Sequence, residues 1–294
     1  MLKDYLAEIF EPTILLSFFC SALGVAAASE VGTINLPLAA AVVIGSVLAQ
    51  ISVNLVNDYH DFASGLDKAT KKTRFSGGSR LVVSGAVKHK DVLYLSVSAA
   101  IIAGIIGLIL AFAVSMYLLV LMLVGAIAIF LYTKYIVKFP LLPEPFVMLA
   151  FVLVGAGSYV AAHGSFSGIY YALLTVVPAG MLGGIALLVN EVPDAEIDKK
   201  FGRRHAVIVF NSKRKTSAYY IALEAVTYAI VIFGVMKSVL NPFFLLVLVT
   251  LPVAGYVGVG IMRYKDPQSY EKYMAANVAA ILIYQALLVL AYSL

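Results

Sequence analysis

Two short acidic segments combine carboxylate and amide side chains at spacings that suit a divalent metal ion. The first begins at position 57 and the second at position 190, and both follow the pattern Asn-acid-x-x-acid. With the acids that follow them, the oxygen-bearing side chains are Asn57, Asp58, Asp61 and Asp67 in the first segment, and Asn190, Glu191, Asp194 and Asp198 in the second. Acids three or four positions apart share one face of a helix, so each segment presents a pair of carboxylates to one side.

Carboxylates gathered in this way repel one another unless a cation joins them. Mg²⁺ prefers one or two carboxylates together with water and phosphate oxygens, so two facing clusters predict Mg²⁺ ions that bridge a diphosphate. Basic residues follow both segments and would neutralise the remaining phosphate charge: Lys68, Arg74 and Arg80 after the first, and Lys199, Arg203 and Arg204 after the second. Such a clamp stabilises charge that develops on a leaving group.

A single acidic loop is most often a solvated surface, and only the matched pair with its flanking cations favours the metal site. The histidines add no metal-ligand spacing, and no catalytic role is assigned to His60, His89, His163 or His205. The glycine-rich run at 75–80 lacks a phosphate-loop pattern, so a flexible turn explains it equally well.

The elements that must carry these residues are membrane helices. The chain is 62% hydrophobic and 13% charged, whereas soluble domains average about one quarter charged. Since only helices or closed barrels satisfy the backbone in lipid, we expect one all-α membrane domain over residues 1–294. The predicted spans are 13–30, 36–56, 92–112, 114–133, 145–162, 170–190, 216–236, 241–262 and 272–293.

The basic residues define the expected topology. With nine spans, every Lys and Arg except Lys237 falls on the side of the amino terminus, together with both acidic segments. The positive-inside rule then predicts that the amino terminus and both segments are cytoplasmic in a multi-pass cell-membrane protein. The net charge of +5 therefore reflects topology, and no nucleic-acid partner is expected. The repeated pattern after spans two and six suggests a pseudo-repeat of spans one to four and five to eight, and the oligomeric state is left open.

At these residues the chain resembles the UbiA superfamily of intramembrane prenyltransferases. The family carries Asn-Asp-x-x-Asp with a further Asp after span two, and Asp-x-x-x-Asp after span six. The matching residues are Asn57, Asp58, Asp61 and Asp67, then Asp194 and Asp198, followed by Gly202, Arg203 and Arg204. The resemblance implies nine helices around a central cavity, with polar loops over its cytoplasmic mouth and a lateral opening to lipid.

The segment 57–67 and the run 75–80 are similar to the naphthoate branch of this family, called MenA. That branch prenylates 1,4-dihydroxy-2-naphthoate with loss of its carboxylate, a step of menaquinone biosynthesis. Tyr132 and Lys138 also match the family segment that closes span four, whereas Glu11 replaces an Arg that many members carry before a proline near the start.

The resemblance further implies residue roles and partners. Mg²⁺ would be held by Asn57, Asp61, Asp194 and Asp198, with support from Asp58, Asp67 and Glu191. The diphosphate ligands would be Lys68, Arg74, Arg80, Lys138 and Arg203. The expected catalytic set is Asp58, Asp61, Asp194, Asp198 and Tyr132, and Tyr132 and Tyr159 are candidates for cation–π support of an allylic cation. The expected partners are a prenyl diphosphate, an aromatic acceptor and membrane lipid.

The sequence leaves the acceptor open and allows one other class of protein. Within the enzyme interpretation, 4-hydroxybenzoate, homogentisate, a tetrapyrrole or a glycerol ether lipid could replace the naphthoate as acceptor. From a different class, a secondary transporter also uses duplicated halves and polar residues in membrane helices, but its binding groups usually lie near the bilayer midplane.

Overall fold

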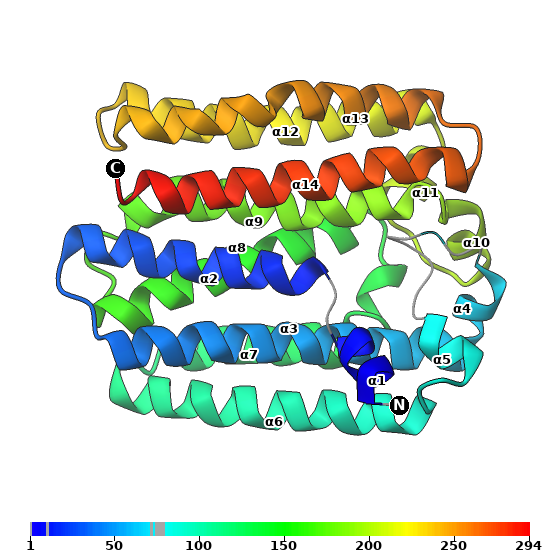
Figure 1. The fold of residues 1–294 in the computed structure, drawn as a ribbon, viewed down its shortest axis with the longest axis horizontal. Helices are drawn as coiled ribbons and strands as arrows, with labels where there is room; N and C mark the ends of the chain where they lie inside the picture. The colour runs from blue at the N-terminus through cyan, green and yellow to red at the C-terminus, as the bar shows by residue number, and fades with distance from the viewer. Residues whose placement is uncertain (1, 10–11, 71–72, 74–79) are drawn as a thin grey trace.

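Long helices run side by side along one axis of the molecule, and short helices and loops cover one end (Figure 1). The computed structural model describes residues 2–9, 12–70, 73 and 80–294, and this part of the chain forms helices without strands. The prediction of an all-α membrane fold is confirmed.

Nine apolar helical segments of the described chain correspond to the predicted spans. They are α2 (Pro12–Val31), α3 (Leu36–Ser64), α6 (His89–Ala113), α7 (Leu118–Leu131), α8 (Pro143–His163), α9 (Ile169–Glu191), α12 (Lys213–Met236), the pair η2 (Pro242–Thr250) and α13 (Leu251–Arg263), and α14 (Pro267–Ala291). Among the described residues, eight of these segments are long and apolar enough to cross a membrane, and α7 is the shorter ninth.

Helix α7 has 14 residues, fewer than the predicted span 114–133. At about 1.5 Å per residue it is about 21 Å long, less than the roughly 30 Å hydrocarbon core. After Leu131 the chain leaves the helix and turns toward α3. There the Thr133 hydroxyl donates a 2.8 Å hydrogen bond to the side-chain oxygen of Asn57.

Helix α3 is longer than predicted. It continues past position 56 to Ser64, so the first acidic segment is a helical extension of the span instead of a loop. The helix ends at Gly65, whose φ of +85° is left-handed and favours glycine at this position. The short helix α4 (Leu66–Ala69) follows and brings Asp67 back toward α3.

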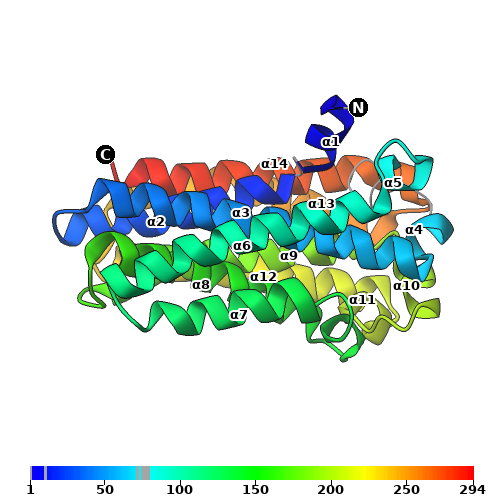
Figure 2. The ribbon, with the colours of Figure 1, turned by 90° about the horizontal axis from the view of Figure 1, so that it is seen from below.

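The remaining short helices gather at the end that carries the acidic segments. Near this end lie α4, α5 (Arg80–Ser84), α10 (Ala195–Lys200) and α11 (Ala206–Phe210), together with α1 (Leu2–Ile9) and the amino terminus (Figures 1 and 2). The 3₁₀ turn η1 (Ile136–Lys138) follows α7. The carboxyl terminus lies at the opposite end, as an odd number of crossings requires.

Close backbone approach holds the centre of the bundle together. A Cβ added at Gly24 of α2 would lie 2.0 Å from the carbonyl oxygen of Gly155 on α8. Small residues at such crossings let membrane helices pack through backbone contact, where water supplies no driving force between helices.

We expect Gly24→Ala to destabilise the protein by about 1–3 kcal/mol, because the new methyl group forces α2 and α8 apart. Thermal unfolding in detergent measures the change as a lower midpoint. Gly255→Ala on α13 is the matched control, since a Cβ there meets no atom within 4 Å. Equal midpoints for the two variants would contradict the packing argument.

Candidate active site

A cavity of about 260 Å³ opens at the end of the bundle that carries the short helices. Its walls come from α2, α3, α4, α8, α9 and α10 and from the segments that follow α4, α7 and α10. Among the described residues, six acidic side chains line it, and all six are buried: Asp58, Asp61, Asp67, Glu191, Asp194 and Asp198. The two acidic segments, more than 120 positions apart in sequence, therefore meet at one site.

The first cluster is built on one face of α3. Asp58 and Asp61 are one helical turn apart, and their residues are 4% and 7% exposed. Asp67 joins them from α4 after the turn at Gly65, and it is 3% exposed. Asn57 lines the same cavity, with its side-chain oxygen held by Thr133.

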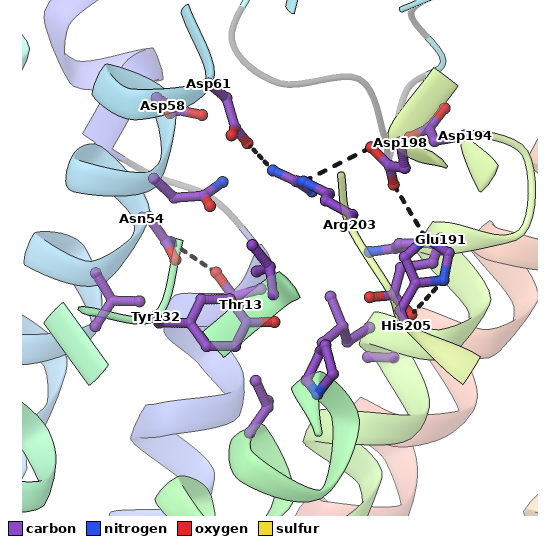
Figure 3. A pocket seen from close by; sticks show the side chains of 18 of the residues that line it. Thr13, Asn54, Asp58, Asp61, Tyr132, Glu191, Asp194, Asp198, Arg203 and His205 are labelled. Atoms are coloured by element: carbon purple, nitrogen blue, oxygen red, sulfur yellow. Dashed lines mark hydrogen bonds and ion pairs between the residues drawn. The ribbon is translucent and has the colours of Figure 1, made fainter. Parts of the chain in front are cut away.

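The second cluster follows the end of α9. Val192 keeps helical dihedrals, but Pro193 has no backbone N–H to continue the helical hydrogen bonds, so α9 ends at Glu191 and the chain turns into α10. Asp194 occupies the position just before α10, and Asp198 lies one turn further on. Both carboxylates reach the cavity from the side opposite α3 (Figure 3).

Arg203 lies between the two clusters. Its guanidinium forms an ion pair with Asp61 and lies 3.7 Å from an oxygen of Asp198 (Figure 3). Gly202, with φ of +82°, reverses the chain after α10, and the Arg203 amide then donates to the Asp198 carbonyl at 3.1 Å. Burial alone would lower the pKa of Arg203, but the Asp61 and Asp198 carboxylates outweigh it and raise the pKa above its ordinary value.

Glu191 lies close to two other buried groups, His205 and Glu144. The His205 imidazole lies between Glu191, at 3.6 Å, and Asp198, at 3.2 Å. Glu144, in the first turn of α8, accepts a 2.7 Å hydrogen bond from the Ala206 amide. Glu144, Glu191 and His205 thus form a compact group beneath the second cluster.

The chemistry of this donor set fits Mg²⁺. Six buried acidic side chains surround the cavity, and among the described residues Arg203 is the one Lys or Arg side chain that lines it. A single guanidinium leaves the carboxylates with excess negative charge, which is costly to bury. A hard dication with oxygen ligands would offset that charge.

The deeper part of the cavity is mostly apolar, with one row of polar side chains. Leu16, Val53, Val147, Phe151 and Leu187 line the apolar part. In the polar row, Gln50 donates to Asn54 at 2.8 Å, and Asn54 donates to the Thr13 hydroxyl at 2.7 Å. The cavity therefore pairs a charged mouth with an apolar interior.

A sequence profile of the UbiA prenyltransferase family matches residues 17–283, which is nearly the whole chain. The chain belongs to the UbiA prenyltransferase family. It is 29% identical over 261 residues to a 1,4-dihydroxy-2-naphthoate octaprenyltransferase of Bacillus subtilis (strain 168), covering 87% of this chain and 81% of that protein.

Solved structures agree with this membership at the level of the fold. The apo structure of a UbiA homolog from Aeropyrum pernix K1 superposes with a TM-score of 0.73 at 18% identity, covering 95% of this chain and 96% of that one. A UbiA homolog from Archaeoglobus fulgidus bound to GPP and Mg²⁺ gives a TM-score of 0.62 at 14% identity, covering 97% and 99%. The family match and the apolar helices together make the chain a multi-pass membrane prenyltransferase. The alternative of a secondary transporter is therefore dropped.

The predicted phosphate ligands differ in their position relative to the cavity. Arg203 lines the cavity, whereas Lys68 and Lys138 are exposed and do not line it. The Lys68 ammonium lies 4.7 Å from the centre of the Phe62 ring. Arg74 and the side chain of Arg80 lie outside the described residues.

The two tyrosines suggested for cation–π support differ in position. Tyr132 lines the cavity beneath the acid clusters, and its ring stacks on Phe146 with centroids 5.8 Å apart (Figure 3). Tyr159 is fully buried among other helices, and its hydroxyl donates to the Ser167 carbonyl near the opposite end of α8. The suggestion for Tyr159 was wrong, because it rested on residue type without a position along the span.

Sequence reasoning missed His205, Glu144 and the polar row on α2 and α3. His205 follows Gly202, Arg203 and Arg204, and this proximity to the second segment was the available signal. Glu144 stands alone at the start of its span. Neither spacing nor composition connects it to Glu191.

Proposed function

We propose that this enzyme transfers the prenyl group of a prenyl diphosphate to 1,4-dihydroxy-2-naphthoate, using Mg²⁺. The observation that carries the proposal is that both acid clusters and Arg203 face one another across the mouth of an apolar cavity. The naphthoate acceptor rests on the similarity to the Bacillus subtilis enzyme and on the match of residues 57–67 to that branch. Mg²⁺ is supported by the donor set and by the related structure bound to GPP and Mg²⁺.

In this proposal each cluster contributes metal ligands. Asn57, Asp58, Asp61 and Asp67 hold Mg²⁺ from the α3 side, and Asp194 and Asp198 hold it from the α10 side. Bound Mg²⁺ supplies neutralising charge for the diphosphate leaving group. Arg203 contributes a forked pair of N–H donors that suits phosphate oxygens.

Other residues of the cavity are suited to the allylic cation and to the acceptor. Cleavage of the C–O bond leaves an allylic cation, which a water-poor and π-rich surface tolerates best. The Tyr132 ring lies where the charged mouth meets the apolar interior, and a desolvated ring contributes about 2 kcal/mol toward a nearby cation. The row of Thr13, Asn54 and Gln50 offers hydrogen bonds to the hydroxyl groups of the acceptor.

Two further cavities extend the apolar interior. A cavity of about 120 Å³ shares Gln50, Val53 and Phe151 with the site, and one of about 280 Å³ between α3, α6, α7 and α8 shares Ser46 and Gly125 with the second. Together they form a path for a long prenyl chain.

We expect Gly125→Phe to shorten the longest prenyl diphosphate that the enzyme accepts. A Cβ at Gly125 meets no atom within 4 Å, and Gly125 lines both further cavities, so the new side chain starts without a clash and extends into the path. Transfer from geranylgeranyl and longer diphosphates should fall about tenfold or more relative to geranyl diphosphate. Gly255→Phe, on an exposed face of α13, should leave the length preference unchanged, and an unchanged preference in Gly125→Phe as well would exclude this path.

The acceptor is tested with purified protein, geranylgeranyl diphosphate, Mg²⁺ and a panel of acceptors, read by mass spectrometry. The panel contains 1,4-dihydroxy-2-naphthoate, 4-hydroxybenzoate, homogentisate and a glycerol ether phosphate. We expect product from the naphthoate, with its carboxylate released as CO₂. Product from another acceptor alone would keep the prenyltransferase and reject the naphthoate.

We also propose that the amino terminus and the active-site mouth face the cytoplasm. In the nine-span topology, all lysines and arginines except Lys237 fall on the side of the amino terminus. The positive-inside rule assigns such a side to the cytoplasm. Single cysteines can be introduced at Lys68 and at Lys237 and exposed, in intact cells, to a thiol reagent that does not cross the membrane. We expect only the cysteine at position 237 to be labelled. Labelling at position 68 alone would reverse the orientation.

A further inference from the structure

Beneath the second acid cluster, three buried side chains point their polar atoms at one another. Glu144 comes from α8, Glu191 from the end of α9, and His205 from the residue before α11; they are 0%, 7% and 1% exposed. One ligand atom from each residue lies within 4.8 Å of the other two. The absence of a side chain at Gly184 lets α8 and α9 approach this closely, because a Cβ there would lie only 2.6 Å from the Glu144 carbonyl oxygen.

No N–H or O–H group of the described residues is placed to donate to the atoms that face one another. Glu144 Oε2, Glu191 Oε2 and His205 Nδ1 are buried without a donor, and the two glutamates bond each other only by sharing a proton. The 3.6 Å between His205 Nδ1 and Glu191 Oε2 is too long for a hydrogen bond. Ligands of a tetrahedral ion at about 2.1 Å lie about 3.4 Å apart, so this separation suits a shared metal ion.

The outer contacts of the three residues match those of metal ligands. The other His205 nitrogen, Nε2, lies 3.2 Å from Asp198 Oδ2, and a ligating histidine usually donates its second N–H to a carboxylate. That tautomer leaves the Nδ1 lone pair directed at the glutamates. The second oxygen of Glu144 is likewise held, by the Ala206 amide at 2.7 Å.

We propose that Glu144, Glu191 and His205 bind a second metal ion, a transition-series dication such as Zn²⁺, separate from Mg²⁺ at the acid clusters. Imidazole together with carboxylate suits Zn²⁺, whereas Mg²⁺ takes oxygen ligands and retains water. Glu191 then belongs to this site instead of supporting Mg²⁺. The ion would join α8, α9 and the segment before α11, and through His205 it would fix the orientation of Asp198.

Glu191 and His205 also line the active-site cavity, which provides an access path for the ion. The proposed metal site does not depend on which acceptor the enzyme uses, because it is inferred from buried donor atoms that face one another.

The test is the metal content of the purified, detergent-solubilised protein after incubation with Zn²⁺ and passage over a chelating resin. We expect about one Zn²⁺ per chain in the wild type, and at least about tenfold less in Glu144→Gln and in His205→Gln. Glu224→Gln, which alters another buried glutamate outside the group, should retain the ion. Asp61→Ala should also retain it, which separates this site from the Mg²⁺ site.

A second measurement uses the wild type alone, in case the variants do not fold. X-ray absorption of the bound zinc should show nitrogen and oxygen neighbours with one imidazole. Wild-type protein that retains no zinc would overturn the proposal in favour of a proton shared by the two glutamates. Zinc without an imidazole neighbour, or full zinc content in both variants, would overturn it as well.

Discussion

Replacing Asp61 with alanine should lower prenyl transfer by at least about 10³-fold. Asp61 is buried at the mouth of the cavity, forms the ion pair with Arg203 and faces the Asp198 side of the site. Its loss removes a proposed Mg²⁺ ligand and the partner that orients Arg203. Steady-state transfer with geranylgeranyl diphosphate, Mg²⁺ and 1,4-dihydroxy-2-naphthoate measures the effect, and Asp194→Ala should give a comparable loss.

The matched control is Glu196→Ala. Glu196 lies on α10 between Asp194 and Asp198, but its side chain is exposed and does not line the cavity. We expect this variant to keep its activity within about twofold, as surface changes usually do. All variants should insert into the membrane normally, because none alters the apolar part of a span. Near-normal turnover in both Asp61→Ala and Asp194→Ala would contradict the two-cluster account.

Arg203→Ala is expected to raise the KM for the prenyl diphosphate about 100-fold, because it removes a charged, forked phosphate ligand. The same change leaves Asp61 and Asp198 buried without their shared cation, which costs about 3 kcal/mol in the ligand-free protein. The thermal midpoint measured with a chelator present should therefore fall. Added Mg²⁺ should stabilise the variant more than the wild type, since the ion replaces the lost positive charge.

Arg204→Ala provides the comparison for this prediction. The Arg204 side chain is exposed. Its backbone N–H donates to the Val137 carbonyl at 2.8 Å and its carbonyl accepts from the Leu141 amide at 3.1 Å, and alanine retains both bonds. Its KM and thermal midpoint should match those of the wild type. If Arg203→Ala behaved like Arg204→Ala in both measurements, Arg203 would have no role in binding the diphosphate.

Much of the architecture could be predicted from sequence because membrane helices follow simple rules. Hydrophobic length located the nine segments, and the repeated Asn-acid-x-x-acid pattern predicted that two distant segments serve one site. The segregation of lysine and arginine placed both segments at the same end of the bundle. These features depend on local composition and on the number of crossings.

The remaining features depend on packing between helices. Lys68, Lys138 and Arg203 carry the same charge and lie close to the motifs, yet the turn at Gly202 directs only Arg203 of these three into the cavity. Similarly, the contact of Glu144 with Glu191 requires the close approach of α8 and α9 at Gly184, which no spacing reveals.

The polar row in the cavity was missed for a related reason. Thr13, Asn54 and Gln50 lie within apolar spans, where an isolated polar side chain gives no sign of which face it occupies. Helix α3 also continued further than hydropathy suggested, because a helix carrying Asp58 and Asp61 can extend beyond the hydrocarbon core.

The most direct test of the central claim is a structure of the protein with Mn²⁺ in place of Mg²⁺ and a non-cleavable thio-analogue of geranylgeranyl diphosphate. The account predicts anomalous scattering from Mn²⁺ between α3 and α10, with ligands from Asp61 on one side and from Asp194 or Asp198 on the other, and with the diphosphate beside Arg203. Metal bound by one cluster only, or a diphosphate outside the cavity, would contradict it.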